Sequence, residues 1–230
     1  MATLRALTTN SLCGAATELY AAFERATGHA VRARYDPAKA ILRDIAAGER
    51  AEVVLLGSGS IDELLAQGLL EPSSVRPIAR SGVGIGVRAG STPPDVSTPE
   101  AFIAALRAVP SIAHTTEGAS GMYFGELLRT LGLADELRAK IRTRPGGLVG
   151  EVLVAGEAFL GIQQVSELMA VPGVVLAGTL PAPWQRMFGN SGGLFRESAD
   201  NAQARALLDW MVSPEAAEVY RRRGLEPSTR

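Results

Sequence analysis

The chain has 230 residues, of which 47% are hydrophobic and 20% are charged. These are ordinary values for a globular protein, and no apolar run is long enough for a membrane helix, so intrinsic disorder and membrane insertion are excluded. Lys and Arg number 23 against 24 for Asp and Glu, and aromatic residues make up only 5%. Nucleic-acid binders usually carry a basic surplus and stacking rings, so we expect no nucleic-acid partner.

A single cysteine, Cys13, excludes an intrachain disulfide and a cysteine-based zinc site, and we expect no metal and no cofactor. The first residues run directly into an alternating apolar pattern, without the basic and apolar regions of a secretory signal. We therefore expect either a cytoplasmic protein or a periplasmic one whose signal precedes this sequence.

Short apolar runs alternate with helical periods, which predicts an α/β protein with helices on the faces of a sheet. Residues 4–6 and 31–35 have the period-2 pattern of strands, and between them apolar residues recur at helical spacings of three and four. The run Val53–Leu56 is continuously apolar, as in a parallel strand covered on both faces. Similar strand and helix patterns recur between residues 111 and 177.

Two glycine-rich extended stretches flank this second set of elements. Gly82, Gly84 and Gly86 alternate with apolar residues, which indicates either close approach of another backbone or a hinge. Residues 188–195 form the second stretch. We therefore expect two lobes, residues 1–82 with 196–230 and residues 83–195, with hinge crossings near 82–88 and 189–196.

Ligands of open α/β sheets bind beyond the carboxyl ends of the strands, near helix N-termini. Four loops of this sequence follow predicted strands and lead into helices, and each offers polar or glycine N–H groups. Together they favour an anion-binding site. They are Thr8–Ser11, Asp36–Lys39, His114–Gly121 and Arg144–Gly147.

The four loops differ in what they offer. Asn10 and Ser11 supply an amide and a hydroxyl, although a plain helix N-cap would use the same residue types. Lys39 lies at the start of a predicted helix, where its positive charge is unfavourable beside the positive end of the helix dipole. A bound anion between the lysine and the helix would remove this conflict. The alternative is that the Lys39 side chain is simply solvated. Ser120 offers a hydroxyl at another helix start. Gly146 and Gly147 offer N–H groups in a turn that can form an anion nest.

Six segments, in this order along the chain, resemble those of the molybdate-binding proteins of ABC transporters. They are Asn10–Leu12, Ala40–Gly48, Ala51–Leu56, Gly118–Tyr123, Leu160–Ile162 and Ser213–Ala217. The resemblance covers nearly the whole chain. It implies a type II periplasmic-binding-protein fold with mixed sheets, in which two α/β lobes close by hinge bending over an anion in an interlobe cleft.

The same resemblance implies a set of ligand contacts and a partner. Carried over residue by residue, the oxyanion contacts of that family fall on Ser11, Lys39, Ser120, Gly146 or Gly147, and Gln164. The implied partner is an ABC permease.

This sequence departs from the family at two of these contacts. Lys39 stands where the family has a serine, and Gln164 stands where it has a tyrosine. The family holds molybdate with neutral donors, whereas a lysine ammonium suits a carboxylate. We therefore expect a solute-binding protein that captures a small organic anion, a carboxylate rather than molybdate.

An alternative is a cytoplasmic enzyme on the same fold, similar to an isomerase or tautomerase of a small organic acid. Lys39 or His114 would then serve as acid and base, since His114 follows a predicted strand and has Glu117 three residues later. The missing secretion signal favours this enzyme. The sequence contains no nucleophile elbow, HExxH segment or Walker loop, which favours the binding protein.

Overall fold

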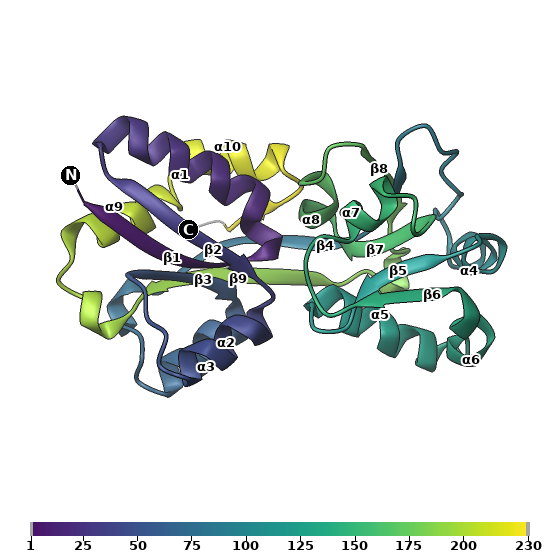
Figure 1. Ribbon diagram of the computed structural model, residues 1–230, viewed down its shortest axis with the longest axis horizontal. Coiled ribbons are helices and arrows are strands. Elements are labelled where there is room, and N and C mark those ends of the chain that lie inside the picture. Colours follow the sequence, from purple (N-terminus) through teal and green to yellow (C-terminus); the bar gives the residue numbers. More distant parts are fainter. Residues whose placement is uncertain (1, 229–230) are drawn as a thin grey trace. The chain divides into compact units, whose positions relative to one another are not determined.

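The computed structural model describes residues 2–228, and the chain divides into two compact units (Figure 1). Unit 1 comprises residues 1–80 and 189–230, and unit 2 comprises residues 81–188. The chain passes from one unit to the other twice. The first passage lies within strand β4 (Arg76–Arg88), and the second lies within strand β9 (Met187–Leu194).

Unit 1 contains a mixed sheet in the order β2-β1-β3-β9. Strand β1 is parallel to β2 and β3, β9 is antiparallel to β3, and β10 pairs with the first part of β4. Its elements are β1 (Thr3–Thr9), η1 (Asn10–Leu12), α1 (Cys13–Thr27), β2 (Ala30–Asp36), α2 (Ala38–Ala46), β3 (Val53–Gly57), α3 (Ser58–Ala66), η2 (Pro72–Ser74), η5 (Arg196–Ser198), α9 (Ala202–Trp210), α10 (Pro214–Arg222) and β10 (Glu226–Pro227).

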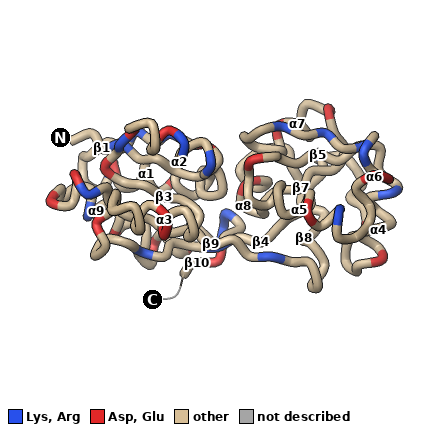
Figure 2. Tube along the Cα trace, turned by 90° about the horizontal axis from the view of Figure 1, so that it is seen from below, with Lys and Arg blue, Asp and Glu red and all other residues tan. Residues whose placement is uncertain are grey.

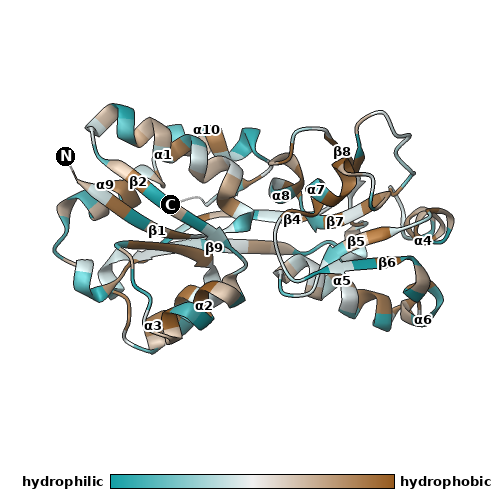
Figure 3. Cartoon of the chain, viewed as in Figure 1, coloured by the Kyte–Doolittle hydropathy of each residue, from teal (hydrophilic) through white to brown (hydrophobic). Residues whose placement is uncertain are grey.

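Helices cover both faces of the unit 1 sheet. Val53 and Leu55 pack with α1, α9 and α10, whereas Val54 and Leu56 pack with α2 and α3. Strand β3 is therefore buried on both sides and is apolar along its length (Figure 3). Burying each such side chain stabilises the fold by about 1.5–3 kcal/mol. Figure 1 shows the two helix layers above and below these strands.

Unit 2 contains a sheet in the order β8-β4-β7-β5-β6. Strand β5 is parallel to β6 and β7, and β4 is antiparallel to β7 and β8. The elements of this unit are α4 (Pro99–Ala108), β5 (Ile112–Thr115), α5 (Ala119–Thr130), α6 (Ala134–Leu137), η3 (Arg138–Lys140), β6 (Ile141–Arg144), α7 (Val149–Val154), β7 (Leu160–Gln164), α8 (Val165–Met169), β8 (Val174–Thr179) and η4 (Ala182–Trp184).

The glycines of β4 let neighbouring elements approach closely. A Cβ atom added to Gly84 would lie 3.0 Å from a methyl group of Val165, and one added to Gly86 would lie 3.1 Å from a methyl group of Val174. On the opposite face, apolar residues of β4, β5 and β7 pack with α4 and α5. Close packing therefore accounts for the glycine pattern of this strand.

The structure assigns residues 189–195 to the other unit than the sequence predicts. Residues 189–195 were expected in the lobe 83–195, but residues 190–194 pair with β3 and the segment belongs to unit 1. None of the helices between residues 2 and 228 has the length and apolar character needed to span a bilayer. Basic and acidic residues are mixed along each unit (Figure 2).

Candidate functional site

Polar side chains gather where the parallel strands of unit 2 end. Strands β5, β6 and β7 run in one direction, so their carboxyl ends lie at one edge of the sheet. Thr115 ends β5, Ser120 lies in the first turn of α5, Gln164 ends β7, and Ser166 lies at the start of α8. All four are at most 6% exposed. We call these four residues the unit 2 polar edge.

Each residue of the unit 2 polar edge has a buried side-chain oxygen without a hydrogen-bond partner. Of six such nitrogen or oxygen atoms within residues 2–228, four belong to this edge: Thr115 Oγ1, Ser120 Oγ, Gln164 Oε1 and Ser166 Oγ. Leaving one buried polar group unpaired costs about 1–3 kcal/mol. Such a concentration is best explained by a polar ligand that supplies the missing partners.

The start of helix α5 adds a positive potential to this edge. The helix has 12 residues, and Gly118 precedes it without a side-chain cap. A Cβ atom on Gly121 would lie 2.0 Å from the carbonyl oxygen of Thr115, so only glycine allows the helix to begin so close to β5. The free N–H groups and dipole of the first turn favour an anion near Ser120.

Gln163 and Glu167 form a buried network beside the polar edge, and sequence reasoning missed both. Gln163 Oε1 accepts a 2.7 Å hydrogen bond from the N–H of Val149, and its Nε2 donates to Glu167 Oε1 over 3.0 Å. Glu167 Oε2 accepts from the N–H of Gln164 over 3.2 Å. Gln164 and Glu167 have the arrangement of a helix capping box, in which the Glu167 N–H faces the Gln164 side chain. Gln164 Oε1 nevertheless has no hydrogen-bond partner among the described residues.

Burial raises the pKa of Glu167 to about 8, although the N–H of Gln164 and the amide of Gln163 oppose this shift. Most copies of this carboxyl are therefore protonated at pH 7. The protonated Glu167 side chain carries no negative charge, so it does not repel an anion bound near Gln164. This is the electrostatic condition that an anion site at the polar edge needs.

Gly146 and Gly147 form the turn between β6 and α7. Gly147 has a φ of 80°, in the left-handed region that favours glycine. Its carbonyl accepts a 2.9 Å hydrogen bond from Gln163 Nε2, which fixes the turn. No described residue accepts a hydrogen bond from the N–H of either glycine. The turn thus has the features that the predicted anion nest requires.

His114 lies within β5 rather than after a strand, because the strand continues to Thr115. Its ring packs edge-on against Phe124 of α5 at 5.3 Å, and its Nδ1 lies 3.0 Å from the carbonyl oxygen of Thr115. Burial lowers its pKa, whereas the carbonyl groups of Thr115 and Gly121 raise it. Burial therefore favours the neutral form of the His114 ring.

In unit 1, Asn10 and Ser11 follow β1 and are both buried. No side chain of the described residues caps the start of η1 or α1, so the N-cap interpretation fails. The Ser11 hydroxyl instead donates a 3.0 Å hydrogen bond to Asn190 Oδ1 of β9. Asn190 Nδ2 is buried and has no partner among the described residues. Asn190 was not predicted, since nothing in the sequence brings residue 190 to the end of β1.

Lys39 lies in the first turn of α2 and is exposed. Strand β2, which precedes this helix, is parallel to β1, with Asp36 beside Thr9. Lys39 therefore lies at the same edge of the unit 1 sheet as Asn10 and Ser11. No described acidic residue forms an ion pair with it, in contrast to Arg34, which contacts several carboxylates.

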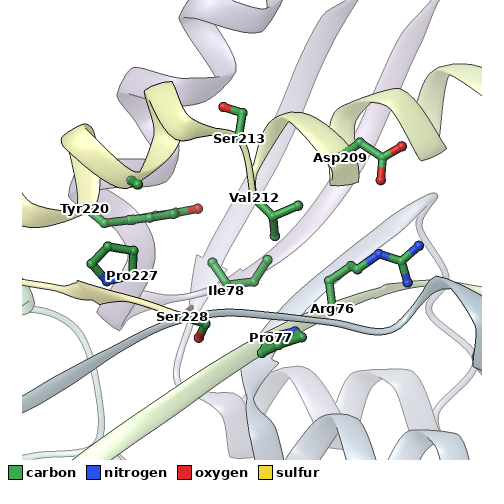
Figure 4. A pocket seen from close by; sticks show the side chains of 10 residues that line it. Arg76, Pro77, Ile78, Asp209, Val212, Ser213, Tyr220, Pro227 and Ser228 are labelled. Carbon is green, nitrogen blue, oxygen red and sulfur yellow. The ribbon is translucent and has the colours of Figure 1, made fainter. Parts of the chain in front are cut away.

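A separate pocket of about 280 Å³ lies elsewhere in unit 1, between β4, β10 and the helices α9 and α10 (Figure 4). Its lining includes Arg76, Asp209 and Tyr220. The Arg76 guanidinium already donates to the carbonyl oxygens of Ser73 and Val75. The lining contains no residue that the sequence assigned to the ligand site.

Known proteins resemble this chain in sequence and in structure. It is 36% identical over 231 residues to an aconitate isomerase of a Pseudomonas species, a match that covers 98% of this chain and 88% of that protein. Its fold matches the periplasmic molybdate-binding protein of Azotobacter vinelandii with a TM-score of 0.82 and 22% identity, over 98% of this chain and 100% of the other. It also matches the sulfate-binding protein SubI of Mycobacterium tuberculosis with a TM-score of 0.77 and 17% identity, over 99% and 87% of the two chains.

These structural matches confirm the predicted resemblance and show the two-lobe periplasmic-binding-protein fold. The family model of bacterial extracellular solute-binding proteins matches residues 4–226, nearly the full sequence. The chain therefore belongs to the family of bacterial extracellular solute-binding proteins.

Proposed function

We propose that this protein binds a small organic anion through one or more carboxylates. The observation that carries the proposal is the unit 2 polar edge, where four buried oxygens lack partners beside the start of α5. Three of them are hydroxyls that can donate to a carboxylate. The helix start supplies positive potential, and the protonated Glu167 adds no opposing charge.

Residues at the carboxyl edge of the unit 1 sheet offer further contacts for an anion. Asn190 Nδ2 offers a buried N–H donor, oriented by Ser11, and Lys39 supplies a full positive charge. A lysine ammonium gives a charge-assisted hydrogen bond to a carboxylate, which is about twice as strong as a neutral one. The lysine therefore favours an organic acid over molybdate.

A thermal-shift screen tests this proposal. The purified protein is heated with mono-, di- and tricarboxylates and with molybdate, tungstate and sulfate. A ligand present at a hundred times its dissociation constant stabilises the protein by about 2.7 kcal/mol, which is a clear shift. We expect at least one carboxylate to raise the melting temperature and molybdate to have little effect. A response to molybdate alone would contradict the proposal.

Family membership supports a role in uptake, in which the bound anion is delivered to an ABC permease. Co-purification of the protein with a permease in the presence of the carboxylate identified above tests this role. Stimulation of that permease's ATP hydrolysis by the loaded protein, compared with the ligand-free protein, is the functional readout. A loaded protein that stimulates no permease encoded by the same organism would contradict the transport role.

A second candidate function is isomerisation of an aconitate-like tricarboxylate. The observation that favours it is the 36% identity to an aconitate isomerase over nearly the whole chain. A base can convert cis- and trans-aconitate by removing a proton from the methylene carbon. The double bond then shifts by one carbon, and a proton returns to the other end of the allylic system. The sequence offers His114 and Lys39 as the groups for this step.

Proton NMR distinguishes the two functions. The protein is incubated with trans-aconitate in D₂O, and the spectrum is followed over hours. An isomerase produces cis-aconitate, with deuterium entering the methylene group whenever the proton exchanges with solvent. A binding protein shifts or broadens the signals without new products. Loss of turnover in His114→Gln or Lys39→Met at saturating trans-aconitate, with binding retained, would identify the base.

A further inference from the structure

Arg186 lies between η4 and β9, in unit 2, with its guanidinium against a pair of aromatic rings whose centroids are 6.3 Å apart. The Cζ atom is 5.3 Å from the centroid of the Tyr123 ring and 5.4 Å from that of Phe188. Both distances are within the range of cation–π contacts. The aromatic rings come from α5 and β9, so two elements hold the side chain.

The surroundings of Arg186 are themselves fixed. The Tyr123 hydroxyl donates a 2.7 Å hydrogen bond to the carbonyl oxygen of Trp184. Gln185 Oε1 accepts hydrogen bonds from the N–H of Arg186 over 2.8 Å and from the N–H of Val83 over 2.9 Å. The backbone of Arg186 is thereby tied to β4. Such a side chain loses little conformational entropy when it binds a ligand.

The charge of Arg186 is not neutralised by the rest of the described chain. No acidic residue within residues 2–228 forms an ion pair with it, whereas Arg107 and Arg144 pair with Glu136 and Glu151. The side chain is exposed. Its planar fork of N–H donors matches the two oxygens of a carboxylate.

Neighbouring residues connect Arg186 to the unit 2 polar edge. Val83, which Gln185 holds, lies directly opposite Gln164 in the pairing of β4 with β7. Tyr123 is three residues after Ser120 on α5, a spacing that places their Cβ atoms about 5–6 Å apart on one helix face. The Tyr123 ring that contacts the guanidinium and the Ser120 side chain therefore project from neighbouring turns of α5.

We infer that Arg186 binds a second carboxylate of the ligand and so restricts the site to di- and tricarboxylates. The inference rests on the proposed function, because it assigns the first carboxylate to the unit 2 polar edge. A monocarboxylate would occupy that edge and leave Arg186 unpaired. The preference for di- and tricarboxylates thus depends on Arg186, which is not among the contacts that the resemblance to molybdate-binding proteins implies.

Calorimetric titration of the wild type and three variants tests this inference. The probes are trans-aconitate as a tricarboxylate, glutarate as a dicarboxylate and crotonate as a monocarboxylate. Arg186→Gln removes the charge, and Arg186→Lys keeps the charge but loses the planar fork. Arg129→Gln is the matched control, since Arg129 is an exposed residue of α5 whose Nε donates to the carbonyl oxygen of Gly125. Circular dichroism confirms that each variant is folded.

We expect Arg186→Gln to weaken binding of the best wild-type polycarboxylate by about tenfold to a hundredfold. Arg186→Lys should lose less, and Arg129→Gln should bind like the wild type. Equal affinity of Arg186→Gln and the wild type for that probe would overturn the inference and leave the proposed function intact. Wild-type binding of crotonate as tight as that of the polycarboxylates would also overturn it. If the wild type binds no carboxylate, both the inference and the proposed function fail.

Discussion

The hydroxyl of Ser11 donates a 3.0 Å hydrogen bond to Oδ1 of Asn190, a residue 179 positions later in the chain. This contact joins the turn after β1 to strand β9 within unit 1. Because Oδ1 is occupied, the amide group is fixed with Nδ2 as a donor. That nitrogen is buried and has no partner among the described residues.

Asn190→Asp should therefore impair ligand binding more than folding. The aspartate keeps an oxygen that can accept from Ser11, but it replaces the free N–H donor with a negative charge. We expect the affinity for a carboxylate to fall by more than about tenfold, because a lost hydrogen bond to a charged group alone costs about 1.5–3 kcal/mol. Calorimetry with the best carboxylate from the thermal-shift screen measures this change.

Asn201→Asp is the matched control for this prediction. Asn201 caps α9 in the same unit, with Oδ1 accepting from the N–H groups of Gln203 and Ala204. Aspartate caps a helix as well as asparagine does, so this variant adds the same charge without loss of structure. If the variants at positions 190 and 201 bind the ligand equally well, Asn190 does not contact it.

Removing the unpaired hydroxyls of unit 2 should weaken binding without weakening the fold. In Thr115→Val and Ser120→Ala, a buried oxygen without a partner is lost. We expect the free energy of unfolding without ligand to stay unchanged or to rise by about 1 kcal/mol. The affinity for the carboxylate should fall about fivefold in each variant, which corresponds to one neutral hydrogen bond. Urea unfolding and calorimetry measure the two effects.

Ser74→Ala supplies the contrast. The Ser74 hydroxyl donates to the carbonyl oxygen of Glu71 over 2.7 Å and accepts from the N–H of Leu194 over 2.9 Å. Its loss should lower the free energy of unfolding by about 1–3 kcal/mol and leave affinity unchanged. Should Thr115→Val lower stability as much as Ser74→Ala does, its hydroxyl has a structural role and the ligand interpretation is wrong.

Lys39→Met should abolish most of the ligand-induced rise in melting temperature. Methionine keeps an apolar stem but removes the charge, and Lys39 is exposed without an ion pair to any described residue, so the ligand-free melting temperature should hardly change. The expected loss of affinity is about tenfold to a hundredfold. Lys140→Met is the control, since the Lys140 ammonium donates to the carbonyl oxygen of Arg107. If Lys39→Met binds the carboxylate as tightly as the wild type does, Lys39 is a solvated side chain that does not contact the ligand.

Glu167 should make the stability depend on pH. Its pKa in the folded protein is about 8, above the ordinary value of 4.5. The folded state therefore holds a proton that the unfolded state releases between these values. The stability that this proton confers is complete below pH 4.5 and is lost as the pH rises through about 8.

Glu167→Gln cannot titrate and should remove this dependence. We expect the wild type to lose stability relative to the variant between about pH 5 and pH 8, by at most about 1.4 kcal/mol per pH unit. Urea unfolding of both proteins at several pH values gives the difference directly. His114 is present in both, so its titration cancels. Parallel stability curves would show that Glu167 is ionised in the folded protein.

Much of the fold follows from local sequence patterns. The apolar run Val53–Leu56 predicted a strand covered on both faces, which β3 is. Strand β6 (Ile141–Arg144) was indicated only by the loop that follows it, because the strand has one apolar residue and gains its partner from β5. Residues 189–195 were assigned to the wrong lobe because their pairing with β3 depends on residues far away in the chain.

The candidate site was predictable from strand ends and from the family resemblance. Ser120 was expected in a loop after a predicted strand and Gln164 from the resemblance, and the structure buries both with an unpaired oxygen. Asn190 could not be predicted, because its role depends on a hydrogen bond to Ser11. Glu167 was also missed, since only the packed structure shows that this carboxyl is buried.

Isothermal titration calorimetry of the wild-type protein with trans-aconitate, glutarate and molybdate tests the central claim most directly. The claim is that the protein takes an organic anion, because Lys39 and the unit 2 polar edge suit carboxylates. We predict micromolar binding of at least one of the two carboxylates and weak or no binding of molybdate. Micromolar binding of molybdate together with no response to either carboxylate would contradict the claim.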